Sequence, residues 1–385
     1  MPPQPHDPLW KRALWATPFL PLAIWPWLEP EASAAHAIPY LLQMAQDGVW
    51  TSSNGEITLS MTEPRLHIPL LDNAMGPLLA VFTPSMTGID PVSRLQMISF
   101  LADVGPLFAV GMLEKFRRRH HWSAILYPIL FAIASQVLGI GKLAGAYFLV
   151  ESFWSPTLNP ATARGASMPP AAVYSLLGAM LLVFYPPLVA SYFAPTVEGR
   201  VVSNAVWQLF PILVSSAQAV LFLILRGRDR ESENRKTTKT QTQAAKTRPD
   251  LPAIRATITT LSALSALAFL HAHLTRPVDI SMTQIFFPLD YASPVDCFET
   301  AVRRLLQWDH LCWVVPGYYW LLLSFREFVL RGVPVPWGLV VLGVLLGTVG
   351  VGAGATFGVV WLGREGLLLG CFEGEGEEEG GVKRD

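Results

Sequence analysis

Apolar residues fill long stretches of this chain, and several stretches are long enough for a helix that crosses a bilayer. A crossing needs about 20 apolar residues at a rise of about 1.5 Å per residue. Candidate stretches lie at 10–28, 96–113, 122–141, 171–193, 201–225, 256–274, 311–325 and 334–362. Tryptophans such as Trp122 and Trp337 lie near their ends, as in an interfacial belt. The pattern predicts an all-α, polytopic integral membrane protein with about seven to eight transmembrane helices.

The polar stretches between these segments divide the chain into six parts. Gly- and Glu-rich or Arg-, Lys- and Thr-rich sequences are typical of solvated, disordered segments. The expected parts are an N-terminal anchor helix at 1–28, a mixed loop and interfacial region at 29–95, membrane helices with the candidate acid site at 96–225, a basic disordered linker at 226–255, C-terminal membrane helices at 256–362 and a disordered tail without chemistry at 363–385.

The positions of Lys and Arg predict which loops face the cytoplasm. Basic residues crowd into 115–119 and again into 226–255, and the positive-inside rule places both loops on the cytoplasmic side. Three apolar segments lie between these loops, yet two loops on one side need an even number of crossings. Either one segment does not span or another is hidden, and 171–193 is the suspect because proline pairs break helices.

Composition supports a membrane protein and excludes several other classes. Hydrophobic residues make up 51% and charged residues 15%, whereas soluble chains carry about 25% charged residues. Cys297, Cys312 and Cys371 lie far apart and form no CxxC pair, so neither a zinc site nor a disulfide framework is predicted. No DDxxD, NDxxD or DxDD motif is present, so no metal or cofactor is expected. The net charge of −1 gives no indication of a nucleic-acid partner, and we expect none.

Asp103 is the most unusual residue of the apolar stretches. It is the only charged residue between Arg94 and Glu114, and it lies near the middle of a predicted membrane helix. An ionisable group at that depth costs several kcal/mol and indicates a functional site. Because low dielectric disfavours the charged form, we expect a protonated acid that can donate to an alkene. The alternative is a hydrogen bond to a neighbouring helix.

Two glutamates could add further acid groups. Glu114 follows Asp103 by 11 residues, almost three turns, so both carboxyls face the same direction about 16 Å apart. Glu114 would lie at the cytoplasmic mouth, unless it only pairs with a nearby Arg or Lys. Glu151 precedes Trp154 and could line the other mouth with it, or could be an ordinary interfacial charge.

Polar and aromatic residues also fall inside the segment that starts at 201. Asn204, Trp207 and Gln208 lie at spacings of three and four residues, roughly on one helix face. Amides inside a membrane segment commonly join helices, whereas an indole can stabilise a carbocation by its ring face. Helix packing and pocket lining therefore both remain open for these three residues.

Asp309 and His310 begin the short segment at 311–325, directly after Trp308. An acid and an imidazole at the mouth of a helix could together remove the last proton from a cation. The final segment is rich in glycine, with Gly343/Gly347 and Gly350/Gly354 at GxxxG spacing. This spacing favours close helix packing.

Three stretches of this sequence resemble one known family. FLADVGPLFAVGMLE at 100–114, NAVWQLFPI at 204–212 and the TRPVDISMTQIFFP…LLQWDHL region at 275–311 are similar to the membrane-bound terpene cyclases of fungal secondary metabolism. The branch is typified by the cyclase of the ascofuranone pathway, with relatives in meroterpenoid and indole-diterpene routes. The resemblance covers residues 65–325 approximately, and the Gly-rich last helix, the acidic tail and the long basic linker depart from it.

The resemblance implies a metal-independent, acid-initiated terpene cyclase in a multi-helix membrane protein, in the endoplasmic reticulum. Such enzymes protonate a terminal alkene or epoxide of a prenyl chain on an aromatic or polyketide core, and a cation cascade then closes rings. Asp103 would be the donor or its partner, and the lipid bilayer would surround the enzyme. The main alternative is a proton-coupled transporter that uses the same buried Asp as a relay.

Overall fold

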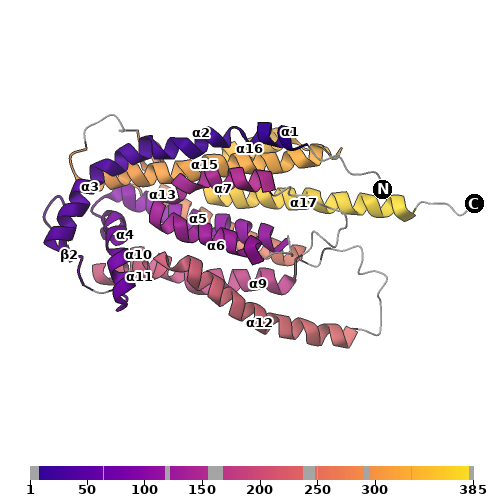
Figure 1. Ribbon diagram of the computed structural model, residues 1–385, viewed down its shortest axis with the longest axis horizontal. Helices are drawn as coiled ribbons and strands as arrows, with labels where there is room; N and C mark the ends of the chain where they lie inside the picture. Colours follow the sequence, from indigo (N-terminus) through magenta and orange to yellow (C-terminus); the bar gives the residue numbers. More distant parts are fainter. Residues whose placement is uncertain are drawn as a thin grey trace, which may run out of the picture.

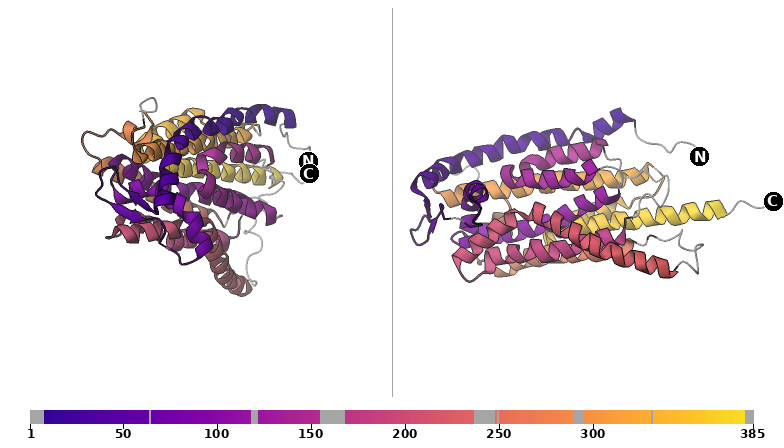
Figure 2. Two further views of the ribbon diagram at one scale, coloured as in Figure 1. Left: turned by 60° about the vertical axis from the view of Figure 1, so that its left-hand side comes forward. Right: turned by 60° about the horizontal axis from the view of Figure 1, so that its bottom comes forward.

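The computed structural model describes residues 8–63, 65–117, 122–154, 168–236, 248, 250–289, 295–330 and 332–380. Its long helices lie side by side along one axis, so that α1 begins and α17 ends toward the same end of the bundle (Figure 1, Figure 2). The elements, in chain order, are α1 (Leu9–Ala16), α2 (Phe19–Ile24), η1 (Trp25–Trp27), α3 (Glu29–Asp47), β1 (Val49–Thr51), β2 (Thr58–Ser60), α4 (Pro69–Thr87), α5 (Pro91–Arg117), α6 (Trp122–Leu138), α7 (Ile140–Trp154), α9 (Pro170–Ala179), the π-helix η2 (Met180–Phe184), α10 (Tyr185–Phe193), α11 (Val197–Gln208), α12 (Phe210–Lys236), α13 (Leu251–Thr275), α14 (Met282–Phe286), α15 (Phe298–Val329), α16 (Trp337–Val351) and α17 (Ala353–Gly380).

Four of these helices are both long and apolar enough to cross a membrane. They are Pro91–Arg117, Pro170–Phe193, Phe210–Gly227 and Leu251–Thr275, and two further apolar helices, Pro128–Leu138 and Trp337–Val351, are shorter. The helical class predicted from the sequence is confirmed, with one short antiparallel hairpin, β1–β2, added to it among the described residues. The predicted count of seven to eight crossings exceeds the four found by length and composition in the same residues.

Two predicted single spans are each two helices. The segment 201–225 divides between α11 and α12 at Leu209, because Pro211 lacks an N–H and fits only the first turn of a new helix. The segment 334–362 divides at Gly352, whose φ of 90° favours glycine. A Cβ on Gly347 would lie 2.7 Å from Oγ1 of Thr356, so the chain reverses at Gly352 and α16 and α17 form a hairpin.

The predicted N-terminal anchor is also interrupted, at its prolines. Instead of one helix over 10–28, α1, α2 and η1 follow one another with breaks at Pro18 and Pro26. Helix α2 packs on α7 and α3 packs on α15. The approach to α7 is close, because a Cβ on Gly145 would lie 2.6 Å from the backbone nitrogen of Ala23.

The structure adds one helix, α7, to the three apolar segments predicted between the two basic loops. The stretch after α5 contains two helices, α6 and α7, joined at Gly139, whose φ is 88°. Four helical passes therefore lie between the end of α5 and the end of α12, counting α9–α10 and α11–α12 as one pass each. Arg117 of α5 and Arg248, just before α13, both pair with Glu365, so these chain segments meet at one end of the bundle.

Both segments expected to be disordered are partly helical. Helix α12 continues through Lys236, and α17 continues through Gly380. Arg364 and Glu365, assigned to the tail, are fully buried. Their ion pairs with other helices, described below, explain why this part of the tail is ordered. Residues 237–247, 249 and 381–385 of the predicted linker and tail lie outside the described residues.

Candidate active site

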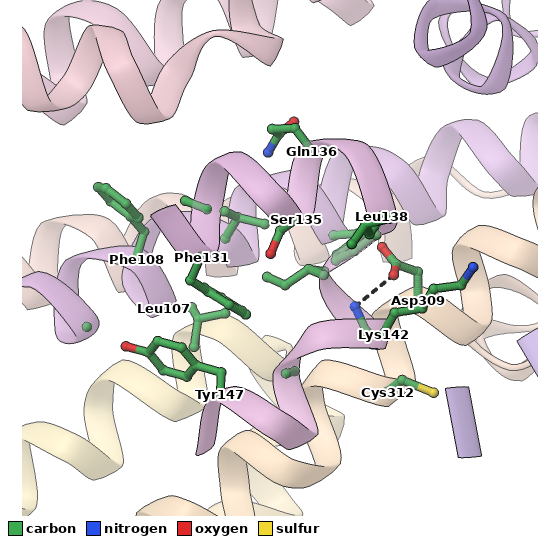
Figure 3. Close-up of a pocket in the computed structure, with 18 of the residues that line it drawn as sticks. Leu107, Phe108, Phe131, Ser135, Gln136, Leu138, Lys142, Tyr147, Asp309 and Cys312 are labelled. Carbon is green, nitrogen blue, oxygen red and sulfur yellow. Dashed lines mark hydrogen bonds between the residues drawn. The ribbon is translucent and has the colours of Figure 1, made fainter. Parts of the chain in front are cut away.

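A mainly apolar cavity of about 270 Å³ opens between α5, α6, α7 and α15 (Figure 3). Small-molecule sites usually lie in pockets of about 300 to 1,000 Å³ with apolar walls and few polar groups. The aromatic residues of its wall are Phe82, Phe100, Phe108, Phe131, Tyr147, Phe148, Trp207, Phe210, Trp320 and Phe357. Such a wall excludes water and presents ring faces that attract cations.

Three carboxyl groups interrupt this aromatic wall: Glu114, Glu151 and Asp309. Asp309 bonds to the first turn of α7 at Gly141, whereas Glu151 lies in the last turn of the same helix. Ten residues of α7 separate those two turns, which corresponds to about 15 Å along the cavity. The wall therefore carries acidic groups toward both ends, with aromatic rings between them.

Asp309 is held by the start of α7. Its Oδ1 accepts a hydrogen bond from the backbone N–H of Gly141 at 2.7 Å. The helix α7 begins without a side-chain cap of its own, so Asp309 satisfies one of its free N–H groups. Lys142 lies beside Asp309, with Ser135 nearby on α6 (Figure 3). This end of the cavity thus combines a desolvated carboxyl with an amine.

The two glutamates pair with cations. Glu114 Oε1 accepts hydrogen bonds from Arg364 at 2.8 Å and from the indole of Trp361 at 3.0 Å. Glu151 forms an ion pair with Lys115, and both side chains are buried. The pairing expected as the alternative role of Glu114 is therefore present, and one partner, Arg364, comes from α17. Both glutamates therefore reach the cavity wall as members of ion pairs with basic side chains.

Asp103 and His310, chosen separately from the sequence, lie in contact. Asp103 is fully buried, and its Oδ2 lies 3.2 Å from Nε2 of His310. Its Oδ1 accepts a hydrogen bond from Ser265 of α13 at 2.5 Å. Neither Asp103 nor His310 lies among the residues that line the cavity. The hydrogen bond to a neighbouring helix, which the sequence left open for Asp103, is thus observed.

Adjacent residues of α15 face different environments. Asp309 points to the cavity and α7, whereas His310 points to Asp103. Consecutive residues of a helix diverge by about 100°, since one turn takes 3.6 residues. Of these two candidates for the terminal base, Asp309 therefore lines the cavity and His310 does not.

The expected substrate-binding residues separate in the same way. Trp207 lines the cavity and packs its ring against Phe210 at 5.2 Å. Gln208 instead donates a hydrogen bond to Asn204 at 3.3 Å, and both amides are buried away from the cavity lining. The two amides thus bond to each other within α11 and do not line the cavity. Trp154 ends α7, and its side chain lies outside the described part of the chain.

Replacing Gly354 with alanine is expected to destabilise the packing around Asp103. The new Cβ would lie 2.5 Å from Cα of Asp103 and 2.7 Å from its Oδ1. Overpacking of this kind costs about 1 to 3 kcal/mol, measurable as a lower midpoint of unfolding in detergent. The control is Gly343→Ala, where no atom lies within 4 Å and where alanine favours the helix. Equal stability of the two variants would contradict the close contact of α17 with α5.

Sequence reasoning missed a buried charge network at one end of the bundle. Glu365 accepts ion pairs from Arg117 at 2.8 Å and Arg248 at 3.1 Å, and it also pairs with Arg364. Arg248 pairs in turn with Asp250 at 2.8 Å. With Glu114 included, the network joins α5, the start of α13 and α17. Arg117 and Arg248 lie in basic stretches, and Arg364 and Glu365 were assigned to the tail, so the sequence did not indicate that they meet.

The aromatic wall was also missed, although part of it leaves a signal in the sequence. Phe100, Val104, Leu107, Gly111 and Glu114 line the cavity from α5. Their spacings of three and four residues mark one helix face. Among the described residues, no three His, Cys, Asp or Glu side chains gather into a possible metal site.

Comparison with known proteins places this chain in a family. The model of the CtvD domain matches residues 51–369, most of the chain. The chain belongs to the CtvD domain family. It is 26% identical to the terpene cyclase ctvD of Aspergillus terreus over 42% of this chain and 47% of that protein. The resemblance to the fungal terpene cyclase family is thus confirmed. No solved structure matches the chain.

Longer relatives share almost the whole of this CtvD-domain chain. It is 27% identical to the FAD-dependent monooxygenase verC1 of Penicillium polonicum over 93% of this chain and 43% of that protein. It is 25% identical to the FAD-dependent monooxygenase anuJ of Penicillium roqueforti over 94% of this chain and 42% of that protein. The chain therefore spans less than half the length of each of these curated relatives, and their names describe much longer proteins.

Proposed function

We propose that this chain is a metal-independent terpene cyclase that closes rings in the prenyl chain of an aromatic or polyketide precursor, in secondary metabolism. The observation that carries this proposal is the cavity, whose wall combines aromatic rings with three carboxyl groups. The name of the relative ctvD, terpene cyclase, supports the same reaction class. An apolar prenyl chain fits an apolar cavity, and ring faces stabilise the cations that form along it.

In this proposal Asp309 donates the first proton. It faces the cavity, and the backbone N–H of Gly141 fixes one of its oxygens. Glu114 and Glu151 are poorer donors, because Arg364 and Lys115 hold them as carboxylates. This assignment reverses the roles expected from the sequence, where the glutamates were acids and Asp309 was the base. Asp103 is a poorer direct donor because it does not line the cavity.

The reaction is an isomerisation in which every atom is conserved. The proton of Asp309 adds to the terminal alkene carbon or to the epoxide oxygen, leaving a cation on the adjacent carbon. Electron pairs of successive double bonds then attack that cation, and each attack forms one carbon–carbon bond. A carboxylate, Glu114 or Glu151, then removes a proton from the last cation. The electron pair of the broken C–H bond forms an alkene or restores an aromatic ring. Exchange with bulk water then reprotonates Asp309 and deprotonates the glutamate, so that the complete cycle neither gains nor loses a proton.

The surroundings of the enzyme are part of the same proposal. The four candidate spans, together with α15 and the shorter helices α6 and α7, would give seven crossings, within the seven to eight predicted from the sequence. The proposed membrane is the endoplasmic reticulum. No cofactor is proposed, and the proposed partners are the prenylated substrate and the lipid bilayer.

The test uses microsomes from yeast that express the chain, with EDTA present. Farnesylated and geranylgeranylated phenols, with and without terminal epoxides, are supplied, and products are identified by mass spectrometry and NMR. We expect a new isomer of unchanged mass from at least one substrate. Uptake of an unchanged substrate into sealed vesicles, without any isomer, would favour the proton-coupled transporter instead.

A further inference from the structure

One ring of the cavity wall is backed by a stack of rings outside the cavity. Phe100 lines the cavity, and its other neighbour is the imidazole of His310, with ring centres 4.6 Å apart and planes at 16°. Trp313 follows on the far side of His310 at 6.0 Å and 23°. Phe286 closes the edge of the imidazole at 5.9 Å. The orientation of Phe100 is therefore set by the orientation of His310.

The orientation of His310 is set in turn by Asp103. Nε2 of His310 lies 3.2 Å from Oδ2 of Asp103, and Ser265 holds the other oxygen at 2.5 Å. The close approach of Gly354 leaves the carboxyl no room to turn, because even a methyl group there would lie 2.7 Å from Oδ1. A continuous series of contacts thus runs from Ser265 on α13 through Asp103 and His310 to Phe100.

We propose that Asp103 and His310 are positioning residues, which fix the ring of Phe100 in the cavity wall and so determine where along the prenyl chain the cation is stabilised. The inference rests on the cyclase function proposed above. A cation held against the face of Phe100 lives long enough for the next double bond to attack it. A cation without that ring face loses a proton sooner, giving an isomer of the same mass with fewer rings.

The first test measures the ratio of fully to partially cyclised isomers. Phe100→Leu and His310→Ala are expected to lower this ratio about tenfold, equivalent to about 1.4 kcal/mol of lost cation stabilisation. Asp103→Leu is expected to do the same, whereas Asp103→Asn keeps the wild-type ratio because an amide still bonds Ser265 and His310. The matched control is Phe325→Leu, which removes a buried ring of α15 that does not line the cavity.

Asp103→Asn also separates positioning from proton donation. If Asp103 were the acid that starts the reaction, its amide would abolish all cyclisation, including the partial products. That result would overturn the positioning role. Wild-type ratios in both His310→Ala and Phe100→Leu, with an active parent enzyme, would overturn it as well while leaving the cyclase function intact.

A second test needs no catalytic activity. 4-Fluorophenylalanine placed at position 100 reports the environment of that ring by fluorine NMR in detergent. We expect one sharp resonance in the parent protein and in the Asp103→Asn variant, and several or broadened resonances in His310→Ala. A single unchanged resonance in His310→Ala would show that His310 does not position the ring, whichever reaction the cavity carries out.

Discussion

Replacing Asp309 with asparagine is expected to slow cyclisation by at least about 100-fold, the lower range for loss of a general acid. The amide has no acidic proton for the alkene or epoxide. Its oxygen can still accept a hydrogen bond from the backbone N–H of Gly141, which in the parent protein lies 2.7 Å from the carboxylate. The start of α7 therefore keeps its partner. The initial rate of isomer formation in microsomes, normalised to the amount of folded protein, measures the effect.

The control for this variant is Asp296→Asn, which changes an exposed carboxyl shortly before the same helix. We expect it to cyclise at the parent rate. Parallel variants Glu114→Gln and Glu151→Gln test the other two wall carboxyls, and a change of product pattern is expected for them because they receive the final proton. A parent rate in Asp309→Asn, with loss of activity in Glu114→Gln, would transfer the donor role to Glu114.

Replacing Glu365 with alanine is expected to lower the free energy of unfolding by about 3 to 5 kcal/mol. Glu365 is fully buried and pairs with Arg117, Arg248 and Arg364. Without it, the carboxylates that remain for these three buried guanidinium groups, within the described part of the chain, are Glu114 and Asp250. The uncompensated buried charges destabilise the folded protein, and the free energy of unfolding in mixed detergent micelles measures the loss.

The matched control for Glu365 is Glu198→Ala. The side chain of Glu198 is 51% exposed, and its partner Arg65 keeps a second carboxylate, Glu63. Solvent screens such a pair, so the free energy of unfolding should fall by less than about 1 kcal/mol. Combining Glu365→Ala with Arg117→Met removes one of the uncompensated charges and should recover part of the loss. Equal losses for Glu365→Ala and Glu198→Ala would contradict a structural role of the buried network.

Local pattern explains which features of the fold could be predicted. The helical class follows from apolar runs, and the four strongest spans follow from their length and lack of charge. The positions of the breaks were harder to predict. Proline and glycine occur at many places in these helices, including Pro106 within α5 and Pro316 within α15, and only packing decides which of them interrupts a helix. Pro211 and Gly352 do so here.

For the candidate site, chemistry was visible in the sequence but not its arrangement. Asp103, His310, Asp309 and Glu114 stand out as ionisable groups in or near apolar segments. Which of them share a space depends on residues far away in the chain. His310 meets Asp103 across 207 residues, and Arg364 meets Glu114 across 250. No periodicity within one segment carries that information.

The sequence by itself therefore determined the helical class, the membrane-type composition, the family resemblance and the short list of acids, because each depends on residue types within a few turns. The tertiary structure alone decided that Asp309 faces an aromatic cavity, that His310 stacks on Phe100 and contacts Asp103, and that the supposed tail contributes buried charges at Arg364 and Glu365. The reason is physical: a helix fixes the angles between its own side chains, but the helices packed around it determine which of those side chains face a cavity.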